Sequence, residues 1–130
     1  MPAYNSIVPP YSISTGDTYQ LFNAEQPVPG SGGASASQQV ALAPARADGP
    51  TPFSVDGKFS AAPGAFEVDI QAAAIDADAN YQTVSGGNIT AVDATNNTFH
   101  FDAQFVTAKF IRALVRSRTN AVNLTLNITR

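Results

Sequence analysis

The last residues of the chain, 121–129, alternate strictly between apolar and polar side chains. The apolar positions of one parity are Val122, Leu124, Leu126 and Ile128. Successive side chains of a β-strand point to opposite faces, so this pattern predicts a strand with one buried and one solvent-facing side. Residues 107–117 are also rich in apolar side chains, and residues 118–120 can turn the chain between the two segments. We therefore expect the chain to end in an antiparallel hairpin.

Residues 108–117 also fit a helical pattern, because Phe110 and Leu114 lie four residues apart, as do Ile111 and Val115. The local Ala, Lys, Arg and Leu residues favour a helix as well. We prefer a strand because the segment is short, no capping residue precedes it and its neighbours have strand patterns. In a strand, the odd-numbered residues from 111 to 115 would face the core.

Further short strands are predicted upstream. Residues 66–71 alternate with Phe66, Val68 and Ile70 expected inside, and residues 98–105 carry phenylalanine at alternate positions. Weaker strand patterns occupy residues 19–24, 38–43, 81–84 and 89–92, and residues 53–59 contain two short runs that flank a possible turn. Turn signals recur about every 8 to 12 residues, a spacing typical of β-sandwiches and barrels. The sequence therefore predicts an all-β fold, an antiparallel β-sandwich.

Turns are expected between these strands from their Gly, Asn and Asp residues. Asp56-Gly57 is a strong hairpin signal because a type I′ turn needs positive φ at both central residues, although a bulge or bend also fits. Residues 85–88 form a Ser-Gly-Gly-Asn turn by composition, and residues 61–64 and 93–97 give two more.

The N-terminal part has a different composition. Pro2, Pro9 and Pro10 force extended backbone within residues 1–18, and residues 27–37 are rich in Gly, Ser and Ala. We therefore predict an extended N-terminal arm and linker over residues 1–37 and a sandwich domain over residues 38–130.

Composition limits the classes of partner. Only 13% of the 130 residues are charged and the net charge is −3, so direct nucleic-acid binding is not expected. No apolar stretch approaches the roughly 20 residues of a membrane span, so no membrane partner is expected. A surface with so little charge is covered by polar side chains or by other molecules, and we expect a homo-oligomer, a dimer or a trimer.

The arginines near the C-terminus suggest a binding surface. In a strand, the even-numbered residues 110–118 share one face that mixes arginine with large apolar groups, which is typical of an interface. Solvated arginines whose stems cover apolar surface are the alternative. The expected interface comprises Phe110, Arg112, Leu114, Arg116 and Arg118, with Pro9 and Tyr11 of the arm.

No set of residues indicates catalysis. His100 is the one histidine and shares a strand face with Asp102, but no nucleophile motif accompanies it. Glu67 and Asp69 are interpreted as outward-facing strand residues rather than a carboxylate pair for hydrolysis. Residues 76–80 begin like a calcium loop but lack its glycine and its closing glutamate, so an ordinary turn is preferred. We expect no catalytic residue, no cofactor and no metal site.

Four segments, residues 59–71, 80–84, 108–115 and 122–129, resemble small structural proteins of tailed bacteriophages. That family has an Ala-Ala-Pro-Gly phrase leading into a strand, then a tyrosine strand, an arginine-containing strand and a closing alternating strand. The resemblance covers about residues 53–130. It implies a jelly-roll-like sandwich, similar to discoidin-like carbohydrate-binding modules, and a role as a capsid decoration (cement) protein or minor virion component.

The expected function is therefore that of a non-enzymatic virion protein that bridges major capsid subunits. It would be located on the capsid surface after assembly in the host cytoplasm, and the arm, residues 1–18, would strengthen capsid binding. The alternative is a carbohydrate-binding module of a tail fibre or adhesin, with Tyr4, Tyr11 and Tyr81 as candidate aromatic contacts.

Overall fold

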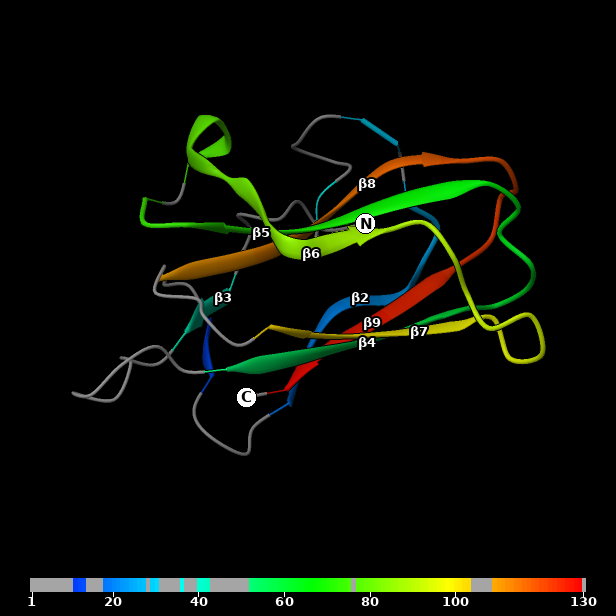
Figure 1. The fold of residues 1–130 in the computed structure, drawn as a ribbon, viewed down its shortest axis with the longest axis horizontal. Helices are drawn as coiled ribbons and strands as arrows, with labels where there is room; N and C mark the ends of the chain where they lie inside the picture. The colour runs from blue at the N-terminus through cyan, green and yellow to red at the C-terminus, as the bar shows by residue number, and fades with distance from the viewer. Residues whose placement is uncertain are drawn as a thin grey trace.

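The protein is a sandwich of two β-sheets packed face to face (Figure 1). The computed structural model describes residues 11–13, 18–27, 29–30, 36, 40–42, 52–75, 77–103 and 109–129. The strands are β1 (Tyr11–Ile13), β2 (Thr18–Glu25), β3 (Val40–Leu42), β4 (Phe53–Phe59), β5 (Phe66–Ala73), β6 (Gln82–Ile89), β7 (Thr98–Ala103), β8 (Phe110–Arg118) and β9 (Leu124–Thr129). The sheet orders are β1-β3-β8-β5-β6 and β2-β9-β4-β7. Apart from the parallel β1–β3 pair, neighbouring strands are antiparallel, which confirms the predicted all-β sandwich. The jelly-roll connectivity stays a prediction.

The core lies between the two sheets and follows the alternation in the sequence. Leu124, Leu126 and Ile128 of β9 are fully buried, while the intervening residues of β9 are partly exposed. The rings of Phe59 and Phe66 pack edge to face, with their centroids 5.0 Å apart. Each large apolar side chain that leaves water contributes about 1.5–3 kcal/mol, so these alternating positions fix which face of each strand turns inward.

β8 is a strand, as preferred from the sequence, and not a helix. Ile111, Ala113 and Val115 join the central core, as the odd-numbered positions predict. Leu114 lies on the other face, in a second small cluster with Ala36, Ala73 and Tyr81, against which Phe110 packs. Both faces of β8 are therefore covered along much of its length.

The predicted C-terminal hairpin is wrong, because β8 and β9 belong to different sheets. β8 pairs with β3 and β5, whereas β9 pairs with β2 and β4. The connection between them crosses the end of the sandwich, where the N–H of Thr119 donates to the Ala65 carbonyl at 2.8 Å. The crossing lets the apolar faces of both strands meet across the core, whereas a hairpin would place them side by side in one sheet.

The predicted hairpin turn at Asp56-Gly57 is also wrong, since both residues lie within the continuous strand β4. Gly57 does not have a positive φ. A Cβ atom at Gly57 would lie 2.1 Å from Cζ of Phe99. Glycine is therefore present because the Phe99 ring lies across the strand there, and not because the chain turns.

The predicted turn at residues 85–88 is a bulge within β6. The pairing of β5 with β6 shifts register between Asp69 and Gln71, so β6 carries extra residues there. Gly86 has φ +78°, a conformation that glycine adopts without strain. The Gly-Gly pair bends the strand locally and does not reverse it.

The N-terminal part contributes to the sandwich. β2 lies within the predicted arm, yet it pairs with β9, and its Phe22 is fully buried in the core. The expected division at residues 37 and 38 therefore does not separate β2 from the sandwich. The residues before Tyr11 lie outside the described part of the chain.

Candidate functional site

The predicted interface on β8 is only partly accessible. Arg112 and Leu114 are each 1% exposed, so neither can offer its side chain to a partner in this conformation. This corrects the prediction for these two residues, because the outer face of the five-stranded sheet is covered by the chain itself. Phe110 is half-buried. Pro9 lies outside the described residues, and Tyr11 lies in β1 but its side chain is not described.

Arg112 is held by groups of its own chain. Its Nε donates to Gln71 Oε1 at 2.9 Å, and its Nη1 donates to Asp78 Oδ1 at 2.7 Å. Its guanidinium carbon lies 4.0 Å from the centre of the Tyr81 ring, a cation–π arrangement. Tyr81 is therefore buried beneath an arginine and cannot serve as the exposed aromatic contact proposed for sugar binding.

Arg116 and Arg118 are more accessible, but both have partners in the chain. Arg116 forms an ion pair with Asp69, and this hydrogen bond raises the pKa of the guanidinium. Arg118 donates from Nε to the Pro27 carbonyl at 2.7 Å. The interface role of Arg116, Arg118 and Phe110 stays a prediction.

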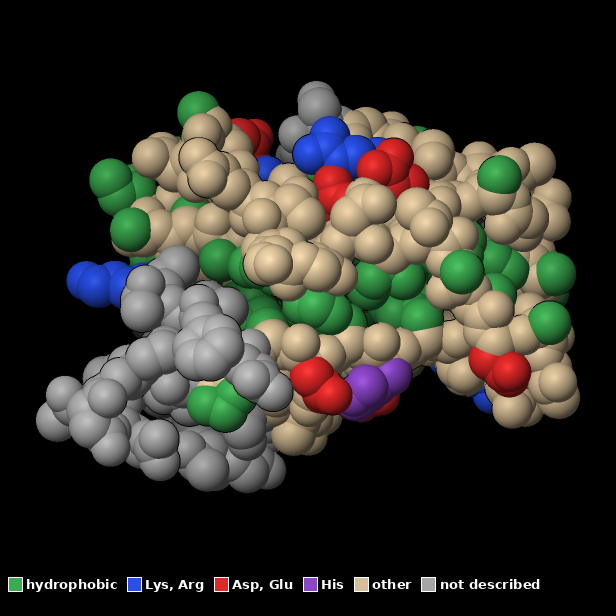
Figure 2. All heavy atoms as spheres, viewed as in Figure 1, with side chains coloured by type: hydrophobic (Ala, Val, Ile, Leu, Met, Phe, Trp, Pro, Cys, Tyr) green, Lys and Arg blue, Asp and Glu red, His purple; other side chains and the backbone are tan. Residues whose placement is uncertain are grey.

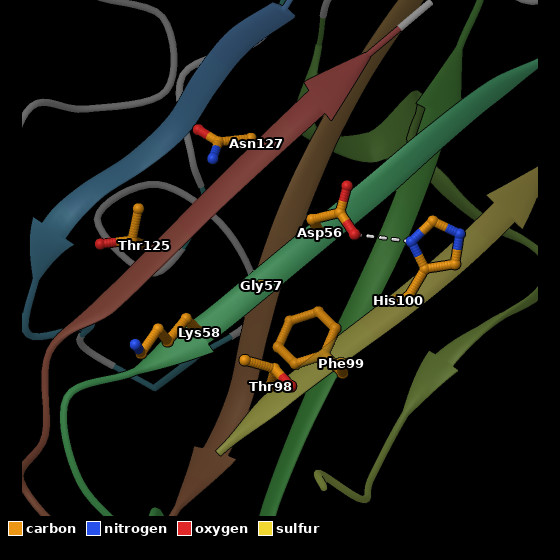
Figure 3. Close-up of a pocket in the computed structure, with 8 residues that line it drawn as sticks. All are labelled: Asp56, Gly57, Lys58, Thr98, Phe99, His100, Thr125 and Asn127. Carbon is orange, nitrogen blue, oxygen red and sulfur yellow. Dashed lines mark hydrogen bonds and ion pairs between the residues drawn. The ribbon is translucent and has the colours of Figure 1, made fainter. Parts of the chain in front are cut away.

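A second polar surface is the outer face of the four-stranded sheet. A hollow of about 510 Å³ lies on β4, β7 and β9 (Figure 3). Its lining residues are Asp56, Gly57, Lys58, Thr98, Phe99, His100, Thr125 and Asn127. Six of these eight have polar or charged side chains, so the hollow presents carboxylate, ammonium, imidazole, hydroxyl and amide groups together.

His100 is the centre of the charged part of this face. Its Nδ1 lies 2.6 Å from Asp56 Oδ1, and its Nε2 lies 2.8 Å from Asp102 Oδ1. The hydrogen bond to Asp56 is the main cause that raises the pKa of His100 above 6.5, and burial opposes it. A neutral imidazole has one N–H, whereas the imidazolium can donate to both carboxylates, so this geometry favours the charged form.

The strand register brings these groups together. Asp56 is directly opposite His100 in the β4–β7 pair, and Asp102 follows His100 on the same face of β7. The sequence identified the His100–Asp102 pair but missed Asp56. The parity of β4 would have indicated it only if residues 53–59 had been interpreted as one strand, because the predicted hairpin turned Asp56 away from β7.

The contacts of His100 differ from those of the histidine in a catalytic triad. In a catalytic triad, one imidazole nitrogen faces a hydroxyl and the other faces a carboxylate. Here both nitrogens face carboxylates, so the imidazole links Asp56 on β4 to Asp102 on β7. The surrounding hydroxyl and amide groups can accept and donate hydrogen bonds to a molecule lying on the sheet.

The remaining candidates give no metal site in the described part of the chain. Across residues 52–75, 77–103 and 109–129 and the shorter described segments, no three His, Asp or Glu side chains are grouped to hold an ion. Asp78 of the calcium-like sequence accepts a hydrogen bond from Arg112, and Asp76 lies outside the described residues. Glu67 and Asp69 both accept from Asn88 Nδ2, at 2.7 and 2.5 Å. In the part of the chain that the structure describes, no helix is long and apolar enough to cross a membrane.

Comparison of the chain with protein-family models and with curated proteins yields no match.

Proposed function

We propose that this chain is a non-catalytic structural protein of a tailed-phage particle, which binds the capsid shell and bridges its major subunits. The exposed polar face of β4, β7 and β9 is the observation that carries this proposal. Among the described residues, the buried charged side chains of the sandwich, Arg112 and Asp69, already have partners within the chain. The segment resemblance to small virion proteins supports the same assignment.

The size of this face indicates that a second contact is needed. Strands lie about 4.8 Å apart and rise about 3.4 Å per residue, so three strands of six residues cover roughly 14 Å by 20 Å. That is on the order of 300 Å², less than half of the ~800 Å² that each partner contributes to a stable interface. The N-terminal residues before β1 supply the additional contact in this proposal.

The proposal is tested by adding the purified chain to capsids that lack it and measuring how much of the chain sediments with the capsids. A chain without residues 2–10 keeps β1 and β2 and is expected to bind at least about tenfold more weakly. Removal of all residues to 18 is a poorer test, because Thr18 belongs to β2 and its hydroxyl lies 2.9 Å from that of Thr129. Unchanged binding by the shortened chain would exclude the arm from the interface.

The sheet face is tested by Asn127→Arg, which places a long charged side chain in the hollow. We expect a loss of capsid binding of at least about tenfold, because the long side chain fills the hollow and keeps a partner surface from close contact. The matched control is Gln82→Arg, at an exposed position of the other sheet. Equal binding by both variants and the original chain would show that this face is not used.

The alternative, carbohydrate binding, is favoured by one specific observation. The hollow combines Asp56, Asn127 and Thr125, whose oxygen and amide groups match the hydroxyls of a sugar. The burial of Tyr81 weighs against it, since sugar rings are usually bound against exposed aromatic faces. Saturable binding on a glycan array that is lost in Asn127→Ala, together with no binding to capsids, would favour this alternative.

A further inference from the structure

One edge of the sandwich differs from the other three. The edge strands are β1, β6, β2 and β7. β1 has only three residues, and β2 and β6 both contain register shifts. Short length and bulges are the usual devices that prevent an edge from pairing with another molecule.

β7 has none of these devices. Its six residues pair with β4 in an unbroken register, from Lys58–Thr98 to Phe53–Ala103. It contains no proline and no lysine. Within the described residues its other side has a single bridge, between Asp93 and Thr98. From Phe99 onward, no described residue pairs with the outer edge of β7, which lies on the same side of the sandwich as β6 (Figure 1).

The backbone groups that face this edge follow from the β4–β7 pattern. The N–H of Phe59 donates to the Asn97 carbonyl at 2.9 Å, which makes Lys58–Thr98 a non-hydrogen-bonded pair. Because the pairs alternate, the N–H and C=O groups of His100 and Asp102 point away from β4. Thr98 shares this orientation, but its carbonyl already accepts from the N–H of Asp93 at 2.8 Å.

We propose that β7 pairs antiparallel with β7 of a second copy of this chain, with Phe101 opposite its own counterpart on the two-fold axis. In this register His100 lies opposite Asp102 of the second copy, and Asp102 lies opposite its His100. The free N–H and C=O groups of these residues then form both hydrogen-bonded pairs of the ladder. The two four-stranded sheets become one continuous sheet.

Charge selects this register over its neighbour. A shift by one pair would place His100 opposite His100 of the second copy and would require the Thr98 carbonyl that Asp93 occupies. The proposed register instead alternates imidazole and carboxylate, with Asp56 and Lys58 of β4 behind them and the uncharged Thr125 and Asn127 of β9 beyond. Like charges directly opposite each other on a sheet are unfavourable, and opposite charges are favourable.

Apolar surface on the inner side supports the same contact. Phe101 is half-buried and packs against the core with Val84, Ile89 and Val92, which are also half-buried. Figure 2 shows apolar side chains in a strip between the two sheets on this side, with the purple imidazole and red carboxylates below it. In the dimer the two Phe101 rings meet and extend this strip across the axis. The inference concerns the association of free copies and stands apart from the capsid proposal.

A single cysteine tests the register, since the chain has none of its own. Phe101→Cys would face its counterpart across a non-hydrogen-bonded pair, where the Cα atoms lie about 4.5 Å apart, close enough for a disulfide. Under oxidised glutathione we expect this variant to form a covalent dimer. Ala103→Cys is the matched control, because its counterpart lies four residues away, at about 13 Å, and should link at least about tenfold more slowly.

Sedimentation of the full chain provides a second, independent test. The original protein is expected to be a dimer, and Asp102→Lys is expected to raise its dissociation constant at least about tenfold, since lysine would face His100 of the second copy. Ser117→Lys places a lysine at an exposed position of β8, in the other sheet, and should leave the constant within about twofold. Circular dichroism confirms that each variant is folded. A monomeric original protein, a stoichiometry other than two, unaltered dimerisation of Asp102→Lys or equal cross-linking of the two cysteine variants would overturn the proposal.

Discussion

The single histidine of this chain is a charged link between two strands. His100 contacts Asp56 on the neighbouring strand and Asp102 on its own strand through different ring nitrogens. The pKa of His100 is raised in the folded state, so its contribution to stability is complete below the unfolded value of about 6.5. The contribution is lost as the pH rises through the folded pKa. Its size is small, because the imidazole is 53% exposed and solvent screens the pair.

The pKa of His100 gives a direct test of this geometry. Titration of its ring protons by NMR should give a pKa above 6.5, and Asp56→Asn should lower it more than Asp102→Asn does, because the Asp56 hydrogen bond has the larger effect. The two variants serve as controls for each other. A larger shift from Asp102→Asn would show that the cross-strand contact is the weaker one.

Arg112 is a buried cation that organises the outer face of the five-stranded sheet. Its position between Gln71, Asp78 and Tyr81 joins β8 to β5 and to the turn before β6. Gln71 is itself only 3% exposed, so its amide oxygen depends on this arginine. The strand parity correctly placed both residues on the outer face, but it did not indicate that the face is covered.

Loss of the Arg112 side chain should be costly. We expect Arg112→Ala to lower the free energy of unfolding by about 3 kcal/mol, because it leaves buried polar groups without their partner. The double variant Arg112→Met with Gln71→Met should lose less than about 1.5 kcal/mol, since apolar groups of similar volume can replace a paired polar set. Urea unfolding followed by circular dichroism measures both. If both variants lost the same free energy of unfolding, the hydrogen bonds of Arg112 would not be the main cause of the loss.

At the scale of elements, close packing determines the residue choice in β4. Phe99 of β7 lies across Gly57 of the adjacent strand and contacts the rings of Phe59 and Phe66, at centroid distances of 6.1 and 6.3 Å. Because Gly57 has no side chain, the Phe99 ring of β7 can pack directly against the backbone of β4. The dipeptide Asp56-Gly57, which on local sequence alone indicates a hairpin turn, here lies within a continuous strand of the sheet.

A methyl group at Gly57 should disrupt this packing. Gly57→Ala is expected to destabilise the fold by roughly 1–3 kcal/mol, because the Phe99 ring is held by two other rings and cannot move freely. Adding Phe99→Leu to Gly57→Ala should recover part of the loss by making room. Thermal unfolding of the single and double variants checks this, and a double variant that is less stable than the sum of both singles would contradict it.

At the scale of the whole molecule, β2 belongs to the sandwich although it lies before residue 38. β2 forms one edge of the four-stranded sheet, and it contributes Leu21 and Phe22 to the core. A fragment that begins at residue 38 would expose one side of β9 and lose both side chains.

We therefore expect the 38–130 fragment to be strongly destabilised. The loss of Leu21 and Phe22 alone removes about 3–6 kcal/mol of apolar burial, comparable to the total stability of many domains. A chain that begins at residue 11 is the control and should retain a cooperative thermal transition. A fragment 38–130 that melts as cooperatively as this control would show that β2 is dispensable.

The sequence by itself determined the strands and their inward faces. Strict alternation in β7 and β9 marked the buried positions, because a pleated strand in a sandwich has one dry side. In β5 and β8 the parity marked the core-facing residues, although Asp69, Gln71 and Arg112 on the outer face are buried as well. Sheet membership was decided only in the tertiary structure. The partners of a strand depend on residues far away in the sequence, so the crossing between β8 and β9, the continuity of β4 and the joining of β2 were not visible locally. The charged site had the same dependence: Asp56 and His100 are 44 residues apart in sequence and meet only because β4 and β7 pair in one register.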